Sequence, residues 1–250
     1  MKRFLTLAFI LCALIVGMES TNAQSKTYDV SSFDEIIVSP HIEVVFEKAD
    51  QESVVIEYID VPYEKLNVEV KGRTLHVYLD DAKVYTKSKK VKYDDYKGKD
   101  AVYDGTVVTA RIYYKDLELI SLRGDETHKL NSELTGGKFK MNLYGEPKVY
   151  VSSMDLDEFH ATLYGEAYLE VQEGKAMAQK IVSYGESEVN TLGVNNTSAK
   201  ITAYGEGRVR LAVSDELKVT AYGEASVHYR GNPTVNKGIV IGDAKIHRMN

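Results

Sequence analysis

Apolar and polar residues alternate with a period of two through most of this chain. The clearest stretch surrounds Gly145, where every second residue from Phe139 to Val151 is apolar or small. The residues between them are polar or aromatic. Because successive side chains of a strand point to opposite faces, this pattern predicts β-strands with one buried face.

The alternation recurs around five copies of Tyr-Gly-Glu, whose glycines are spaced 20, 20, 20 and 18 residues apart. A fixed period of this length is typical of a repeat architecture. Since the alternation continues across each glycine, every copy predicts a strand, a bend and a strand, with the glycine on the inner parity. The third copy places Ser183, Ser187 and Thr191 at inner positions, which predicts a less apolar interior there.

Two degenerate copies flank the five, Arg123-Gly124-Asp125 before them and Ile241-Gly242-Asp243 after them. Terminal repeats are expected to be atypical because they must cap the stack. The first copy spells RGD, a tripeptide that binds integrins in other proteins. Its glycine falls in register with the repeat, so the repeat itself accounts for this tripeptide.

One repeat unit is too short to bury its apolar face alone, whereas stacked copies bury it. We therefore predict an all-β fold, a right-handed parallel β-helix or solenoid with coils of about 20 residues. Antiparallel hairpins in a barrel or propeller are the alternative. The repeats lack the Asn-Gly or Asp-Gly turns that reverse a chain tightly, which argues against hairpins.

The sequence divides into three segments. Residues 1–23 read as a signal peptide, residues 24–115 as an N-terminal β-strand region, and residues 116–250 as the repeat solenoid, continuous with the region before it. Alternating runs predict strands over 33–38, 42–46, 54–58, 66–70, 75–79 and 107–114. An insertion rich in lysine and tyrosine, residues 82–105, interrupts them. It predicts a solvated, mobile loop, with binding to an anionic polymer as the alternative.

The N-terminus carries an export signal. A basic start, Met1-Lys2-Arg3, precedes an apolar run from Phe4 to Val16 and a small-residue cleavage site before Gln24. Cys12, the only cysteine, lies inside the apolar run; cleavage before it, as in a lipoprotein, is the alternative. Without it the mature chain has no disulfide, and no second apolar run of membrane length follows.

Stacking in register would place outward residues in columns about 4.8 Å apart per step. The candidate ligand-binding residues are a tyrosine column and a glutamate column, namely Tyr144, Tyr164, Tyr184, Tyr204 and Tyr222 with Glu146, Glu166, Glu186, Glu206 and Glu224. A basic column precedes the tyrosines, formed by Lys140, His160, Lys180, Lys200 and Lys218. The tyrosines predict either a platform for sugar rings or a partner's apolar face, or a ladder that only stabilises the stack.

The glutamate column needs something to offset repulsion between like charges, such as neighbouring cations, a bound calcium ion or solvent exposure. Acid and base catalysis requires two carboxylates in different environments, which equivalent glutamates do not offer. No nucleophile elbow, P-loop, dinucleotide fingerprint or metal-ligand spacing occurs. We therefore predict no enzyme, no cofactor and no metal site. The net charge of −6 argues against nucleic acid as a partner.

The chain resembles the bacterial putative auto-transporter adhesin, head GIN domain family. The resemblance runs from Tyr28 to the C-terminus and rests on the signal ending at Gln24, the segment Phe33 to Val38, the glycine-centred repeats and the closing Tyr229 to Pro233. The family is named for a repeated Gly-Ile-Asn, where this chain has Tyr-Gly-Glu. The resemblance implies a β-helix-like fold shaped like that of pectin lyases without their catalytic residues, and a role in adhesion.

We expect an exported binding protein of the periplasm, outer membrane or cell surface, adhesin-like or carbohydrate-binding, with a glycan or an envelope or surface protein as its partner. The alternative is a structural or assembly protein of the envelope without a small ligand. A polysaccharide-active enzyme is the third hypothesis, and it requires one coil that breaks the repeat with an acidic or basic residue in a groove.

Overall fold

The computed structural model describes residues 25–92 and 97–249 and contains strands and one short 3-10 helix in these ranges. The predicted signal peptide lies outside the described residues. The C-terminal part is a stack of strands, of which β12 to β16 are long, with 12 to 18 residues. The strands are β10 (Leu119–Gly124), β11 (Thr127–Leu130), β12 (Leu134–Gly145), β13 (Lys148–Gly165), β14 (Tyr168–Gly185), β15 (Glu188–Gly205), β16 (Arg208–Gly223), β17 (Ser226–Arg230), β18 (Thr234–Ile241) and β19 (Lys245–Arg248).

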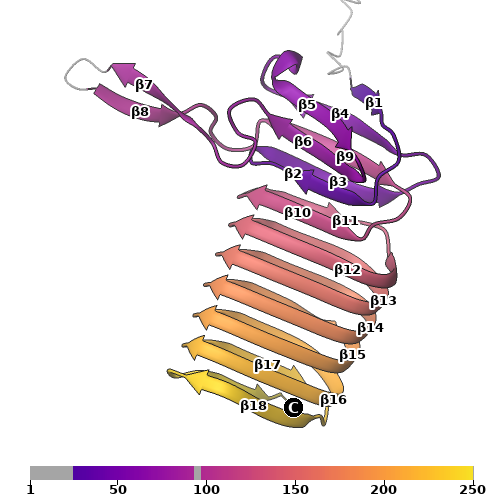
Figure 1. Cartoon of the computed structure of the whole chain (residues 1–250), viewed down its shortest axis with the longest axis vertical. Coiled ribbons are helices and arrows are strands. Elements are labelled where there is room, and N and C mark those ends of the chain that lie inside the picture. Colours follow the sequence, from indigo (N-terminus) through magenta and orange to yellow (C-terminus); the bar gives the residue numbers. More distant parts are fainter. Residues whose placement is uncertain (1–24, 93–96, 250) are drawn as a thin grey trace, which may run out of the picture.

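Each coil pairs in parallel with the next, and equivalent residues of the repeats lie side by side (Figure 1). Tyr144 pairs with Tyr164, and the register continues through Tyr184 and Tyr204 to Tyr222. The parallel pairing confirms a β-solenoid with coils of about 20 residues. It excludes the antiparallel hairpins of a barrel or propeller for the repeats.

The glycines of the repeat form the corners of the coils. From Gly145 to Gly223 they have φ between 99° and 125°, a conformation that side chains disfavour. A Cβ atom added at Gly165 would lie 2.4 Å from the carbonyl oxygen of Gly145 in the preceding coil. The structure therefore corrects one detail of the sequence interpretation: the glycines lie at the rim, and the missing side chain would point along the stack rather than into the core.

The N-terminal region continues the same sheet and covers one end of the stack. Its elements are β1 (Lys26–Asp29), β2 (Glu35–Val38), β3 (Ile42–Lys48), β4 (Ser53–Ile59), η1 (Tyr63–Lys65), β5 (Leu66–Lys71), β6 (Thr74–Leu79) and β9 (Val108–Tyr114). Strands β2 and β3 run parallel to β10 and β11 of the solenoid. Antiparallel pairs, β1 with β4, β4 with β9 and β5 with β6, complete this end.

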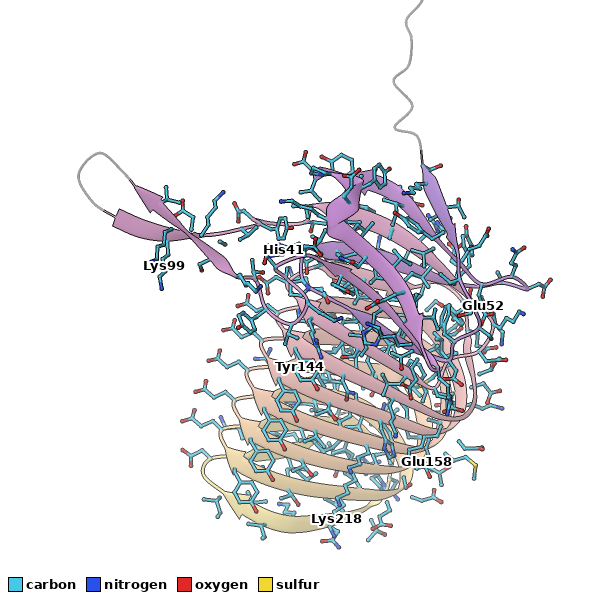
Figure 2. The ribbon with its side chains drawn as sticks, turned by 45° about the horizontal axis from the view of Figure 1, so that its top comes forward. His41, Glu52, Lys99, Tyr144, Glu158 and Lys218 are labelled. Carbon is cyan, nitrogen blue, oxygen red and sulfur yellow. The ribbon has the colours of Figure 1, made fainter. Side chains whose placement is uncertain are left out.

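The sequence predicts a loop for the whole insertion at 82–105, and the structure corrects this prediction. The insertion contains a two-stranded antiparallel hairpin, β7 (Ser88–Lys92) with β8 (Lys97–Ala101), that projects from the body as an arm and carries Lys99 (Figure 2). The side chain of Tyr103 anchors its base, donating a hydrogen bond to the carbonyl of Asp80 at 2.9 Å. None of the described side chains of this hairpin, in 88–91 and 98–101, is buried, so its sequence lacks the alternation that marks the other strands.

The opposite end of the stack is bare. Ile239 and Ile241 in β18 are 57% and 60% exposed. Gly242 continues the glycine column beside Gly223, as the degenerate repeat predicts. The described residues place no further strand over this coil.

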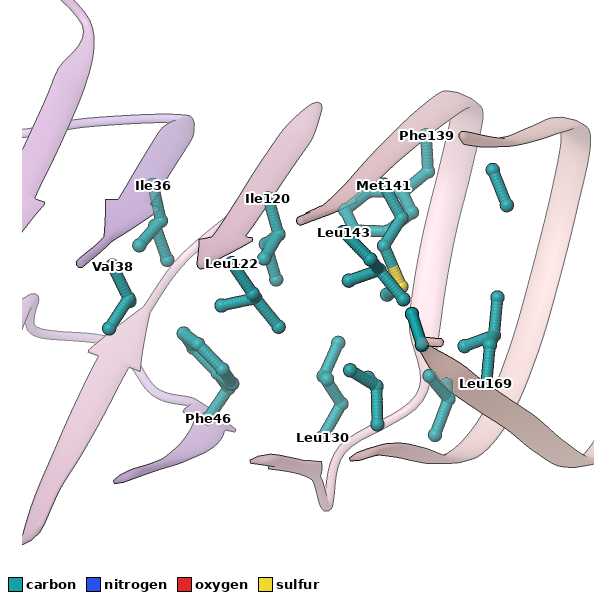
Figure 3. Close-up of a cluster of buried hydrophobic side chains, with 14 of the residues drawn as sticks. Ile36, Val38, Phe46, Ile120, Leu122, Leu130, Phe139, Met141, Leu143 and Leu169 are labelled. Atoms are coloured by element: carbon teal, nitrogen blue, oxygen red, sulfur yellow. The ribbon is translucent and has the colours of Figure 1, made fainter. Parts of the chain in front are cut away.

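One large hydrophobic core joins the N-terminal strands to the solenoid, and a small second cluster contains Ala203, Ala221 and Ala225. Figure 3 shows side chains from β2 and β3, such as Ile36 and Phe46, in line with Ile120 and Met141 of the solenoid. The rings of Phe139 and Phe159 stack at 6.3 Å within it. The predicted less apolar interior of the third copy is confirmed, because four of its inner side chains are buried and polar, namely Gln179, Ser183, Ser187 and Thr191.

Candidate binding face

The outward side chains of the strand segment that precedes each glycine form three columns on one face. The predicted partners pair in register, Lys140 with His160 and Tyr144 with Tyr164, and likewise down to Lys218 and Tyr222. Residues Asn142, Thr162, Val182, Thr202 and Thr220 lie between the basic and aromatic columns. The sheet thus presents a tyrosine at each coil and a lysine at four of the five.

The tyrosine rings stack face to face. Their centroids are 5.0, 4.7, 4.8 and 5.0 Å apart from Tyr144 to Tyr222, with interplanar angles of 2° or 3° (Figure 2). The first four rings are 37–39% exposed. Since each inner ring is covered on both faces, the column offers its edges and hydroxyl groups to a ligand. A sugar stacked on the face of an inner ring, one of the modes that the sequence left open, would find no free face.

The upper end of the tyrosine stack is covered by a cation. The guanidinium group of Arg123 lies 5.7 Å from the ring centroid of Tyr144. This is the arginine of the RGD tripeptide, and its place above the ring agrees with the structural explanation of that motif.

The glutamate column lies just past the corner and is exposed from Glu146 to Glu224. The backbone N–H of each of these glutamates donates a hydrogen bond to the carbonyl of the corner glycine in the preceding coil, at 3.0–3.1 Å. Within the described ranges no ion pair involves these carboxylates. The nearby cation Arg208 contacts Glu188 at 3.3 Å instead. No group of three potential metal ligands occurs in the described part of the chain. Solvent exposure is therefore what offsets the repulsion between these charges.

The basic column contains four lysines and a histidine. The ring of His160 lies 3.1 Å from the carboxylate of Glu158, which also pairs with Lys138 at 2.8 Å. The Lys138 ammonium lowers the pKa of Glu158. Partial burial and the lysines around it, Lys138 first, lower the pKa of His160. His160 is thus neutral at pH 7, and the lysines supply the positive charge of this column.

The sequence interpretation missed a groove elsewhere on the solenoid. It has a volume of about 550 Å³ and is lined by Lys175, Met177, Asn195, Thr197 and Arg230 among others. One signal in the sequence points to it: the last glycine spacing is 18 rather than 20. The shorter coil lies beside the groove.

Comparison with known proteins places the chain in a family. Residues 32–233 match the family described as "Putative auto-transporter adhesin, head GIN domain". The chain belongs to this family. The match covers the N-terminal strands from β2 onward and all five Tyr-Gly-Glu coils, and it ends just before β18.

Solved structures share this head GIN architecture. A putative adhesin from Bacteroides fragilis superposes with a TM-score of 0.73 at 18% identity, covering 90% of this chain and 96% of that one. A putative adhesin from Parabacteroides distasonis gives 0.66 at 19% identity, with 90% and 96% coverage. A putative lipid binding protein from the same species gives 0.65 at 20% identity, with 91% and 96% coverage. At these identities the likeness shows the fold alone.

No curated protein matches the chain at a significant level. The described residues include no helix of the length and apolarity that a membrane span requires.

Proposed function

We propose that this head GIN protein is exported and acts as an adhesin-like binding protein of the cell envelope or surface, holding a glycan along the tyrosine and glutamate columns. One observation carries the proposal. Successive coils present their tyrosine edges in strand register, about one strand spacing apart. The glutamate of each coil follows at an equivalent place, because its backbone N–H bonds to the corner glycine of the coil before it. A polymer of repeating units would meet the same contacts at each step.

Repetition makes weak contacts sufficient. Each coil offers a tyrosine hydroxyl, a carboxylate and, in most coils, a lysine, all of which form hydrogen bonds with sugar hydroxyls. A single set would bind weakly because water competes for the same groups. Several sets joined on one rigid face act together, since after the first contact the others form within one complex.

The same regularity disfavours catalysis. Acid and base roles need two carboxylates whose environments differ. The five glutamates occupy equivalent, exposed corners. We therefore assign binding rather than turnover to this face, and expect a screen for polysaccharide hydrolysis or elimination to be blank.

A glycan array probed with the purified protein tests the proposal. The informative variant combines Tyr164→Phe, Tyr184→Phe and Tyr204→Phe, which keeps the ring stack and removes three hydroxyls. We expect it to melt like the parent and to lose most of the binding. A second variant, Glu166→Gln with Glu186→Gln, should also weaken binding. Array binding that is unchanged in both folded variants would refute a role for these columns.

The alternative is a structural or assembly protein of the envelope, and the covered ring faces favour it. In that case the stack serves only cohesion between coils. Replacing the same tyrosines with serine would then lower the melting temperature, while the phenylalanine variant would behave like the parent in every assay and the glycan array would be blank.

A further inference from the structure

Among the full coils from β12 to β16, the repeat is broken at one place, between β15 and β16. The glycine spacing falls from 20 to 18 there, and the pairing shifts register between Thr191 and Asn195 and again between Asn196 and Ser198. Thr191 pairs with Leu211 and Asn195 with Ala212, so the three residues between Thr191 and Asn195 have no partner in β16. The shorter coil cannot follow the longer one around this corner.

The interior is polar beside this break. Asn196 is 3% exposed, and its amide donates to the carbonyls of Ala212 at 2.9 Å and Val194 at 3.1 Å. The hydroxyl of Thr191 donates to Gln179 at 3.1 Å. Asn196 Oδ1 and Gln179 Nε2 are buried without a hydrogen-bond partner among the described residues. Unsatisfied buried polar atoms are costly, which marks this site as one not optimised for stability alone.

The groove lies against the same residues. Its volume of about 550 Å³ is within the usual range for small-ligand sites. Asn195, Asn196 and Thr197 line it from the broken strand, and Ala212, Val213 and Ser214 from the short coil. Arg230 and the 63% exposed side chain of Met177 also border it.

The lining combines hydrogen-bonding groups with no excess of charge. Asp155 and Asp157 are matched by Lys175 and Arg230, and Lys175 pairs with Asp155 at 3.1 Å. Amide and hydroxyl groups of Asn195, Thr197 and Ser214 add neutral donors and acceptors. Met177 supplies an apolar surface, against which the C–H groups of a ring can pack. A charged ligand gains little from such a lining, whereas a polyhydroxylated ring matches it.

We propose that this groove is a binding site for one neutral sugar unit of an oligosaccharide or polysaccharide. The site is separate from the tyrosine and glutamate columns and is created by the shortened coil. Its side chains differ from coil to coil, so the groove selects one sugar unit. The columns, in contrast, would bind several successive units of a sugar chain.

The test is a titration followed by amide NMR shifts, with four neutral probes used one at a time: cellohexaose, maltohexaose, xylohexaose and mannohexaose. We expect at least one to shift the backbone amides of residues 195–197 and 212–214 in a saturable way. The double variant Asn195→Ala with Thr197→Ala removes two hydrogen-bonding groups and should weaken that binding about tenfold or more. The matched control is Thr135→Ala, in the same outward column as Asn195 but three coils away, which should bind like the parent.

A second variant restores the regular repeat. Inserting Leu-Gly after Leu211, as in the preceding coil, returns the last glycine spacing to 20. The insertion should fill the groove and abolish the amide shifts while the melting temperature stays equal or rises. If it fails to fold, the Asn195 and Thr197 double variant still decides the matter.

The proposal is overturned if none of the four probes shifts these amides, or if the double variant binds as tightly as the parent. These results are distinguishable from failure of the columns. Binding that survives the tyrosine-to-phenylalanine variant but not the Asn195 and Thr197 variant supports the groove and refutes the columns, and the reverse result does the opposite.

Discussion

At the scale of single residues, the corner glycines show how one missing atom sets the geometry of the solenoid. Each combines a positive φ with close approach to the coil before it. At Gly185 an added Cβ atom would meet the carbonyl oxygen of Gly165 at 2.7 Å, and backbone cannot move aside as a flexible side chain could. The glycines therefore control both the bend and the distance between coils.

Gly185→Ala should destabilise the protein by about 2–5 kcal/mol, from backbone strain together with crowding between coils. Gly72→Ala is the matched control, because Gly72 also has a positive φ, 64°, but nothing lies within 4 Å of its added Cβ. It should cost only the strain, about 1–2 kcal/mol. Urea unfolding measures both, and equal losses would contradict the role of crowding.

His128 is the second residue with a large individual effect. It is fully buried beside the ring of Phe46, and neither ring nitrogen has a partner among the described residues. Burial lowers the pKa of His128 from 6.5 to about 3. Between these two values the unfolded chain binds a proton that the folded chain does not, so the free energy of unfolding falls as the pH falls through this window.

His128→Leu should remove that acid sensitivity. From pH 8 to pH 4.5 the parent should lose about 2–3 kcal/mol more than the variant, at about 1.4 kcal/mol per unit of pKa difference. At pH 8 the imidazole is neutral in both states, so that measurement is the reference. Identical pH profiles in urea unfolding would show that His128 does become protonated in the folded protein, or that the fold opens around it.

At the scale of elements, the tyrosine stack is a cohesive contact between neighbouring coils. An aromatic pair in contact contributes about 0.5–1.5 kcal/mol beyond its burial. Tyr184 has a ring on both sides, at 4.7 and 4.8 Å, whereas Tyr222 has a tyrosine on one side only. The inner rings should therefore matter more than the last one.

Tyr184→Ser should cost about 1–3 kcal/mol and Tyr222→Ser about half as much, because the number of ring contacts halves. Tyr184→Phe keeps both contacts and should change stability by less than about 0.5 kcal/mol. Chemical denaturation of the three variants checks the order. A loss at Tyr222 as large as that at Tyr184 would mean that solvent shielding of the sheet, rather than stacking, is the source.

The sequence predicts elements well wherever one face is buried, and less well elsewhere. Alternation of apolar and polar residues predicts strands such as Ile42–Lys48 and Val108–Tyr114. Alternation does not identify the hairpin around Ser88 to Ala101, because none of its described side chains is buried. The columns follow from the glycine spacing, but the covered ring faces do not, since they depend on ring orientation. The 18-residue spacing predicts a short coil, but it does not predict at which corner the two residues are missing.

At the scale of the whole molecule, the solenoid is a one-dimensional array in which each coil contacts its neighbours. Stability in such an array is close to a sum over coils and their interfaces. Removing one complete coil should therefore leave the rest intact. The N-terminal strands cover one end of the array, and the shortened coil lies near the other.

Deleting residues 166–185 removes one coil and joins Gly165 to Glu186. The shortened protein should fold, be about 4.8 Å shorter by small-angle X-ray scattering and unfold with a smaller denaturant m-value. Deleting residues 176–185, half a coil, is the control and should prevent cooperative folding. A full-coil deletion that behaves like the half-coil deletion would show that folding depends on a specific coil rather than on the repeat.

The stacked tyrosines also give the folded protein a spectroscopic signal that depends on the packing of its coils. The chain contains no tryptophan, so tyrosine dominates its near-ultraviolet absorption. Five rings held parallel at no more than 5.0 Å place their transition dipoles within strong coupling range. The native state should show an intense near-ultraviolet circular dichroism signal with rapid energy transfer between rings, and the signal should vanish when the coils separate, before any label or ligand is added.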